Sequence, residues 1–213
     1  MLRFISTRVH SCKMQTQTFD FGITPRTTLE RRILESPDFR ESLAYAYPLP
    51  GRPEPSVGIH VTRLLEYVDF CFPENHERLR LVAMLHDFGK HRVVRDTTGR
   101  IIGPNHADIS ESYARSLISD EGILRIIKSH DKYYSFYLSH TKRRKFDRDR
   151  FVDVYSQIDI PLMTEFNYVD VCERPKTPVI WFEDMCNELG LTSERVYVAH
   201  PKVLVNYEDI PKM

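Results

Sequence analysis

The sequence lacks the features of membrane, secreted and strongly charged proteins. No segment approaches the run of about 18 apolar residues that a membrane-spanning helix requires, and the start MLRFISTRVH lacks the apolar centre of a secretory signal. The 30 basic residues balance 30 acidic residues, so net charge gives no reason to expect binding to nucleic acid or to a membrane surface. We therefore expect a cytoplasmic protein that makes no membrane contact.

Cysteine is scarce and shows no pattern. The four cysteines stand at positions 12, 71, 172 and 186, and no two of them form a CxxC pair. This spacing indicates neither a zinc knuckle nor a disulfide framework. A reducing cytoplasm is the simpler setting for such a chain.

The residues that are present are typical of a folded helical protein. The 213 residues, 41% of them hydrophobic and 28% charged, suffice for one domain of ordinary size. Apolar positions recur at intervals of three and four, as in Val61, Leu64 and Val68, which predicts helices packed on a core. We predict an all-α fold, with an N-terminal extension over residues 1–26 and a single helical domain over 27–213. Its core spans 51–190, and an irregular tail begins near residue 192.

Capping residues and breakers set the expected helix boundaries. Thr27 and Glu30 form a capping-box pattern, Ser36-Pro37 starts a second short helix, and Gly190 fits a left-handed C-cap. Four prolines make residues 48–55 an extended connector. The remaining helices are expected from residue 57, over 77–88, over 106–118, from 120 to near 133–137, over 148–159, from 161 past 170, and over 178–189, with a loop or hairpin over 96–104.

The string LVAMLHDFGKH, residues 81–91, carries the strongest chemical signal. An apolar helix there delivers His86 and Asp87 and then turns at Gly89. Adjacent helical residues do not share a face, so a metal ion bound by both must sit at the helix end, with other helices completing its ligands. Further candidates stand on predicted helices at His60, His106, His130 and Asp170. Imidazole and carboxylate ligands together suit one or two divalent ions of manganese, iron, nickel, cobalt or zinc.

These residues, in the order H…HD…H…H…D, resemble the HD superfamily of metal-dependent phosphohydrolases. The context is similar to the HD domain attached to bacterial tRNA nucleotidyltransferases, in GRPEPSVGIHVTRLLEYV, LVAMLHDFGK and GPNHADISESYARSL, and covers roughly residues 51–175. The resemblance implies an HD-domain helical bundle. It also implies a primary metal held by His60, His86, Asp87 and Asp170, and a second metal held by His106 and His130, with Asp87 bridging the ions.

Two of these assignments have alternatives. Asp153 and Asp159 lie near Asp170 in the sequence and could replace it as the fourth ligand. His106 and His130 could instead contact the substrate phosphate directly.

The resemblance implies a phosphohydrolase that cleaves a phosphomonoester or phosphodiester of a nucleotide or RNA end through a metal-activated water. Lys90 would neutralise phosphate charge, and Asp87 or Asp131 would accept the proton of the water. One alternative is an HD-fold di-iron oxygenase acting on a small polar substrate, which uses the same ligand pattern. Another is a non-catalytic module that binds metal or nucleotide.

Two further features leave their roles open. The basic run Lys142–Lys145 could contact a nucleic-acid backbone or form a solvated helix start. The aromatic residues Tyr133, Tyr134, Phe136 and Tyr137 could stack on a base, although packing is the more common role of such a cluster. The sequence does not indicate an oligomeric state.

Overall fold

The computed structural model describes residues 20–46, 56–72, 76–143, 145–171 and 175–196. This part of the chain is all-α, as predicted: it contains ten α-helices, two short 3-10 helices and one isolated β-bridge, but no strand. The predicted connector 48–55, most of the extension and most of the tail lie outside the described residues. The elements are η1 (Asp20–Gly22), α1 (Thr28–Glu35), α2 (Pro37–Ala44), α3 (Val57–Cys71), α4 (His76–Leu85), η2 (Phe88–Arg92), α5 (His106–Arg115), α6 (Glu121–Ser129), α7 (Lys132–Thr141), α8 (Arg148–Tyr155), α9 (Ile160–Asp170) and α10 (Thr177–Glu188).

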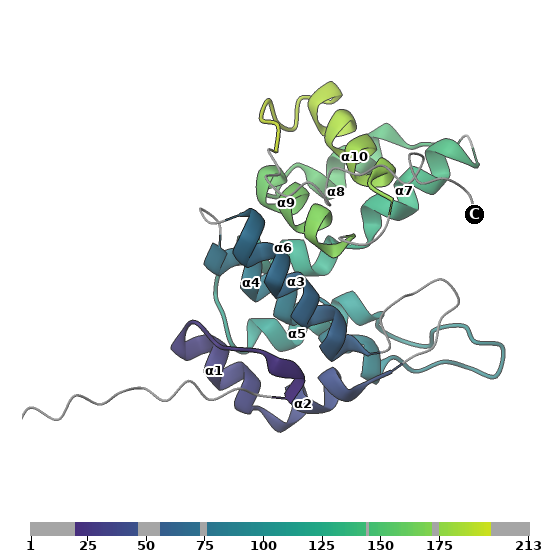
Figure 1. Cartoon of the computed structure of the whole chain (residues 1–213). Coiled ribbons are helices and arrows are strands. Elements are labelled where there is room, and N and C mark those ends of the chain that lie inside the picture. The colour runs from purple at the N-terminus through teal and green to yellow at the C-terminus, as the bar shows by residue number, and fades with distance from the viewer. Residues whose placement is uncertain (1–19, 47–55, 73–75, 144, 172–174, 197–213) are drawn as a thin grey trace, which may run out of the picture.

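Helices α3 and α4 lie at the centre of the molecule (Figure 1). Helices α1 and α2 lie at one end, and α7 to α10 gather at the other. Helix α9 packs against α3, α4 and α10, while α5 packs against both η2 and α6. The central pair therefore contacts helices from both the early and the late parts of the chain.

Buried apolar side chains from all ten described α-helices form one continuous cluster. Leu64, Leu79, Ile127 and Phe166 are fully enclosed in it, and each such side chain contributes about 1.5–3 kcal/mol to folding. Ile23 is also buried in this core, although it belongs to the predicted extension. The division at residue 26 stays a prediction.

Two predicted helix starts are present. The Thr27 side chain accepts a hydrogen bond from the Glu30 backbone N–H at 3.1 Å, which caps α1. Helix α9 starts anew at Ile160, with Asp159 as its cap and Pro161 in its first turn. Proline has no backbone N–H, but no helical hydrogen bond is lost there, because the N–H groups of the first turn have no intrahelical partner.

Among the helices that are shorter than predicted, two end directly before a His-Asp pair. The helix expected over 77–88 ends at Leu85, and the helix expected from residue 120 ends at Ser129. In both cases the histidine Nδ1 donates a hydrogen bond to a backbone carbonyl three residues earlier. The imidazole thereby satisfies a carbonyl of the last turn and ends the helix. The helix expected over 148–159 also ends early, at Tyr155.

A buried ion-pair network joins α1, α3 and α4. The Arg80 guanidinium donates to both carboxylate oxygens of Glu30 at 2.8 Å and to Asp69 Oδ1 at 2.7 Å. It also donates to the Thr24 carbonyl at 3.1 Å. Because the donors and both carboxylates are paired, the buried charges are compensated.

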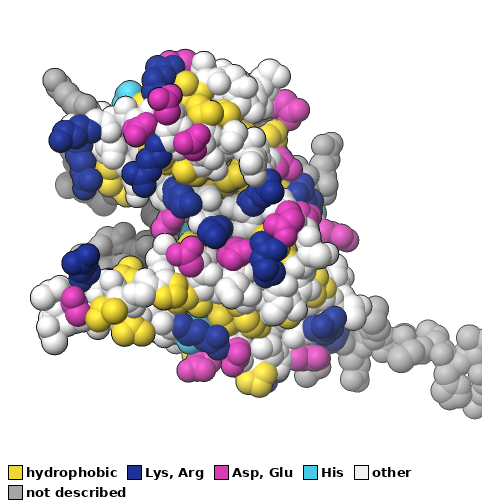
Figure 2. Space-filling view, turned by 180° about the vertical axis from the view of Figure 1, so that it is seen from behind, with side chains coloured by type: hydrophobic (Ala, Val, Ile, Leu, Met, Phe, Trp, Pro, Cys, Tyr) yellow, Lys and Arg dark blue, Asp and Glu magenta, His cyan; other side chains and the backbone are white. Residues whose placement is uncertain are grey.

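Charged side chains of both signs are intermingled on the face shown in Figure 2, and no patch of one sign dominates it. None of the helices in the described ranges combines the length and apolar character needed to cross a bilayer. Of the four cysteines, Cys71 and Cys186 are described, and both are buried. Burial, followed by the nearby Glu183 carboxylate, raises the pKa of the Cys186 thiol to about 12, so it is not a nucleophile at neutral pH.

Candidate metal centre

The His-Asp pair that follows α4 forms the middle of the site. The His86 Nδ1 donates to the Ala83 carbonyl at 3.0 Å, because a carbonyl can only accept. In the neutral imidazole this leaves Nε2 without a proton, and Nε2 faces Asp87 Oδ2 at 3.2 Å. Both side chains are almost completely buried. The edge of the Phe166 ring, from α9, packs on the His86 ring and fixes its orientation.

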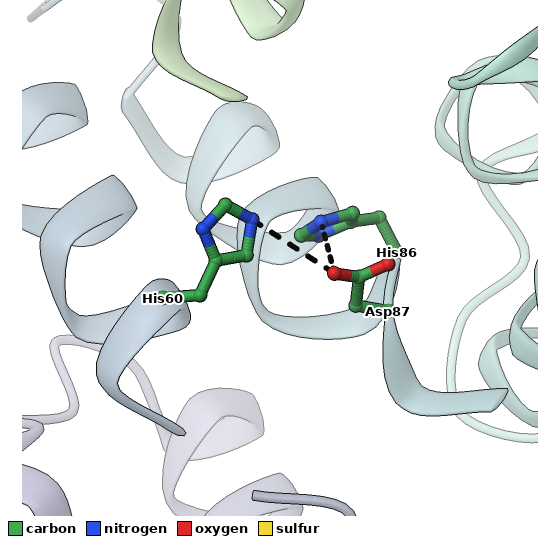
Figure 3. Close-up of side chains that lie close together, drawn as sticks. All are labelled: His60, His86 and Asp87. Carbon is green, nitrogen blue, oxygen red and sulfur yellow. Dashed lines mark ion pairs between the residues drawn. The ribbon is translucent and has the colours of Figure 1, made fainter. Parts of the chain in front are cut away.

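A first group of ligand atoms forms where α3 and α9 meet this pair. His60, from α3, places its Nε2 3.8 Å from Asp87 Oδ2. The rings of His60 and His86 both point toward that oxygen (Figure 3). Asp170, the last residue of α9, places Oδ1 3.1 Å from His60 Nε2 and 3.7 Å from His86 Nε2. Two imidazole nitrogens and two carboxylate oxygens therefore surround one small space.

A second group lies on the other side of Asp87. His106 is the first residue of α5, and His130 follows the end of α6. Their Nε2 atoms are 3.2 Å apart, and they lie 3.7 and 3.8 Å from Asp87 Oδ1. His130 repeats the arrangement of His86, since its Nδ1 donates to the Ile127 carbonyl at 2.7 Å.

Asp87 joins the two groups through its two carboxylate oxygens. Oδ2 faces His60 and His86, whereas Oδ1 faces His106 and His130. The ligand atoms of each triad that includes Asp87 lie within 4.8 Å of one another. This is the geometry of a carboxylate that can bridge two metal ions.

Gly89 allows the turn that follows Asp87 to approach α5, the helix that carries His106. A Cβ at this position would lie 2.2 Å from the His106 backbone oxygen and 2.8 Å from the Cβ of Ile109. The Gly89 N–H also donates to the Ser110 hydroxyl at 2.8 Å. The turn after Asp87 can therefore touch the start of α5 because it carries no side chain there.

The electrostatic environment favours an ionised Asp87 carboxylate and the neutral forms of His106 and His130. Burial by itself would raise the pKa of Asp87, but the neighbouring His86, Lys90 and His60 hold that pKa well below its usual value. Burial lowers the pKa of His106 and His130, because it disfavours the charged imidazolium. An ionised carboxylate and unprotonated ring nitrogens are the forms that bind metal.

The donor set fits a cation. His86 Nε2 is buried and makes no hydrogen bond, although Asp87 Oδ2 is only 3.2 Å away. In the tautomer set by Ala83, this places a nitrogen lone pair opposite a carboxylate oxygen. Two buried acceptors that face each other are destabilising unless a positive charge lies between them. A divalent ion supplies that charge, so the described residues include a buried His/Asp cluster able to hold metal.

The remaining predicted site residues border this cluster. The Lys90 ammonium forms an ion pair with Asp87 Oδ2. Asp131 is half exposed, and its Oδ2 lies 4.0 Å from His106 Nε2. The two alternatives to Asp170 lie elsewhere: Asp153 is exposed on α8, and Asp159 caps α9 and pairs with Arg78. The structure thus brings the six predicted ligands together, while metal binding itself stays a prediction.

Sequence reasoning missed the groups that orient these ligands. The Ala83 and Ile127 carbonyls fix the histidine tautomers, and Phe166 and Ser110 hold His86 and the Gly89 turn in place. The repeated His-Asp after two apolar helices was the available signal for the two carbonyls. No signal in the sequence pointed to Phe166 or Ser110, whose roles depend on tertiary packing.

The basic run lies away from the cluster. Lys142, Arg143 and Lys145 are exposed after the end of α7, whereas Asp131 precedes its start. The ten residues of α7 separate these points by about 15 Å along the helix axis. A role of this run in nucleic-acid binding stays a prediction.

Comparison with known proteins adds no family assignment: no protein-family model, no curated protein and no solved structure matches the chain.

Proposed function

We propose that the protein is a metal-dependent phosphohydrolase that cleaves a phosphate ester of a nucleotide or RNA end. The observation that carries this proposal is the placement of Asp87 between two histidine groups, with one carboxylate oxygen facing each. Such a carboxylate can hold two divalent ions close together, a common arrangement for phosphoester hydrolysis. The order of the six ligands, which resembles the HD superfamily, supports the same reaction.

The ligand groups and two flanking residues have separate roles in this proposal. A divalent ion, when bound, lowers the pKa of a coordinated water and polarises the phosphoryl oxygen. His60, His86 and Asp170 would hold a first ion together with Asp87. His106 and His130 would hold a second, also together with Asp87.

Lys90 supplies positive charge for the phosphate, and Asp131 takes part in proton transfer. The Lys90 ammonium already lies at the rim of the cluster, where it would compensate the charge of a phosphate. Asp131 accepts the proton of the attacking water in our proposal, because it lies near His106 and remains exposed to solvent. Asp87 is less suited to this task, since both of its oxygens face ligand nitrogens.

The test combines elemental analysis of the purified protein with a screen for phosphate release. Manganese- or cobalt-loaded protein is incubated with nucleoside mono-, di- and triphosphates, cyclic nucleotides and RNA with 2′,3′-cyclic phosphate ends. We expect His86→Ala to lose both metal and phosphate release. The matched control is His140→Ala, which removes an exposed histidine near the end of α7.

A second variant guards against loss of folding in His86→Ala. Lys90→Ala removes a partly exposed side chain, so it should keep the metal while kcat/KM for phosphate release falls. If iron-loaded protein consumes oxygen and releases no phosphate, the protein is an oxygenase and the hydrolase proposal is wrong. If metal binds and neither reaction occurs, the chain is a binding module.

A further inference from the structure

One aromatic residue of α7 is exposed one helical turn after Asp131, which borders the candidate metal centre. Tyr133 and Phe136 pack into the core and its surrounding aromatic cluster, whereas the Tyr134 side chain is 49% exposed. A large aromatic ring in solvent forgoes the free energy of burial. The structure thus separates Tyr134 from its neighbours in the aromatic run, which fill the interior.

Tyr134 lies one helical turn after Asp131. Residues three apart on a helix lie on one face, with their Cβ atoms about 5–6 Å apart. Helical side chains lean toward the N-terminus of their helix, so the Tyr134 ring leans toward Asp131. Asp131 in turn lies 4.0 Å from His106 of the second ligand group. The exposed ring therefore lies on the side of α7 that carries Asp131, toward the second ligand group.

Tyr137 supports this ring from behind. The rings of Tyr134 and Tyr137 are stacked, with centroids 6.3 Å apart and planes inclined by 29°. Tyr137 is itself fixed by an edge contact with Trp181, whose centroid lies 5.7 Å away. A pre-ordered aromatic surface binds a flat ligand without a large loss of side-chain freedom.

We infer that Tyr134 stacks on the base of a nucleotide whose phosphate lies at the candidate metal centre. This inference rests on the proposed function and deepens it, because it assigns the residue that recognises the base of the nucleotide. In this inference the phosphate lies near His106, the base lies on the Tyr134 ring, and the ribose connects the two. Stacking tolerates any base, so the residue selects for a base and not for its identity.

Binding tests the inference independently of turnover. Trp181 is the only tryptophan in the chain, and it lies behind Tyr137. A nucleoside 5′-monophosphate with a ribose-linked fluorophore that absorbs tryptophan emission reports binding by energy transfer from Trp181. The manganese-loaded protein is titrated with this probe, and unlabelled inorganic phosphate is titrated as a competitor.

Tyr134→Ala should weaken binding of the probe about 5- to 150-fold, the range expected for loss of one base–aromatic stack. The affinity for inorganic phosphate should stay unchanged, which a merely structural role of Tyr134 would not produce. Tyr134→Phe should restore probe binding. Phe70→Ala, which removes an exposed ring at the end of α3, should match the wild type.

The outcomes separate the inference from the proposed function. Equal probe affinity in wild type and Tyr134→Ala overturns the inference, as does a wild type that does not bind the probe. If the wild type releases phosphate only from esters without a base, metal-dependent hydrolysis stands, but the nucleotide substrate and the role of Tyr134 both fail. If Tyr134 governs nucleotide binding but no phosphate is released, the inference holds and the hydrolase proposal fails.

Discussion

Replacing Gly89 by alanine tests whether the turn after Asp87 must touch α5. The added Cβ would lie 2.2 Å from the His106 backbone oxygen and 2.8 Å from the Cβ of Ile109. Because a carbon–oxygen contact of this kind normally spans about 3.3 Å, the turn and α5 must separate by about 1 Å. The obstacle includes backbone, which cannot rotate away as a long side chain would.

This displacement changes the position of His106, in the second ligand group, relative to Asp87. Asp87 lies two residues before Gly89, and His106 supplies the obstructing oxygen, so their 3.7 Å separation must grow. We expect Gly89→Ala to lose about 1–3 kcal/mol of the free energy of unfolding. An ion that His106 and His130 would hold should be lost before an ion that His60 would hold. A misplacement of about 1 Å is enough to lower turnover about 100-fold.

The assay follows urea unfolding by Trp181 fluorescence and metal content by elemental analysis after dialysis. Gly99→Ala is the matched control, since Gly99 has φ 83° and nothing lies within 4 Å of an added Cβ. Left-handed strain costs alanine about 1–2 kcal/mol there, but the metal content should not change. A Gly89→Ala protein with wild-type stability, metal content and turnover would refute the reasoning.

Three further predictions concern ion pairs and ligands. Arg80→Leu should lower the free energy of unfolding in urea by about 3–5 kcal/mol, because it leaves Glu30 buried without its partner; a loss below 1 kcal/mol would contradict this. Burial opposes ionisation of Asp69, but hydrogen bonds and charge from Arg80 and others lower its pKa below 3.8. Its contribution to stability is therefore present above pH 3.8 and lost as pH falls below it, and Asp69→Asn should flatten this part of the acid-unfolding curve. Asp170→Asn should weaken the affinity for an ion at His60 at least about 10-fold, as measured by metal titration. Unchanged metal content would remove Asp170 from the ligand set.

Regular periodicity made most helices predictable. Val61, Leu64 and Val68 form one stripe that is buried along α3, and its spacing is visible in the sequence alone. The ends of α4 and α6 were placed too late because they depend on the orientation of one histidine ring each. Helical propensity does not report whether His86 or His130 folds back onto the last turn.

The candidate ligands and the place of Asp87 between two groups were expected from the order of the residues and the family resemblance, but the packing that produces this arrangement was not. Asp153 lies on α8, Asp159 caps α9 and Asp170 ends α9, and only the packing of α9 against α3 and α4 places Asp170 beside His60. The division of Asp87 between two histidine groups follows from the close contact at Gly89. Sequence spacing does not encode such a contact between distant segments.

The central claim is that Asp87 bridges two ions, and electron paramagnetic resonance of the manganese-loaded protein tests it most directly. We expect two manganese ions per chain and the multiline spectrum of an exchange-coupled pair, which should be lost in Asp87→Ala. A spectrum of isolated manganese that is the same in wild type and Asp87→Ala, or a chain that binds no manganese, would contradict the account.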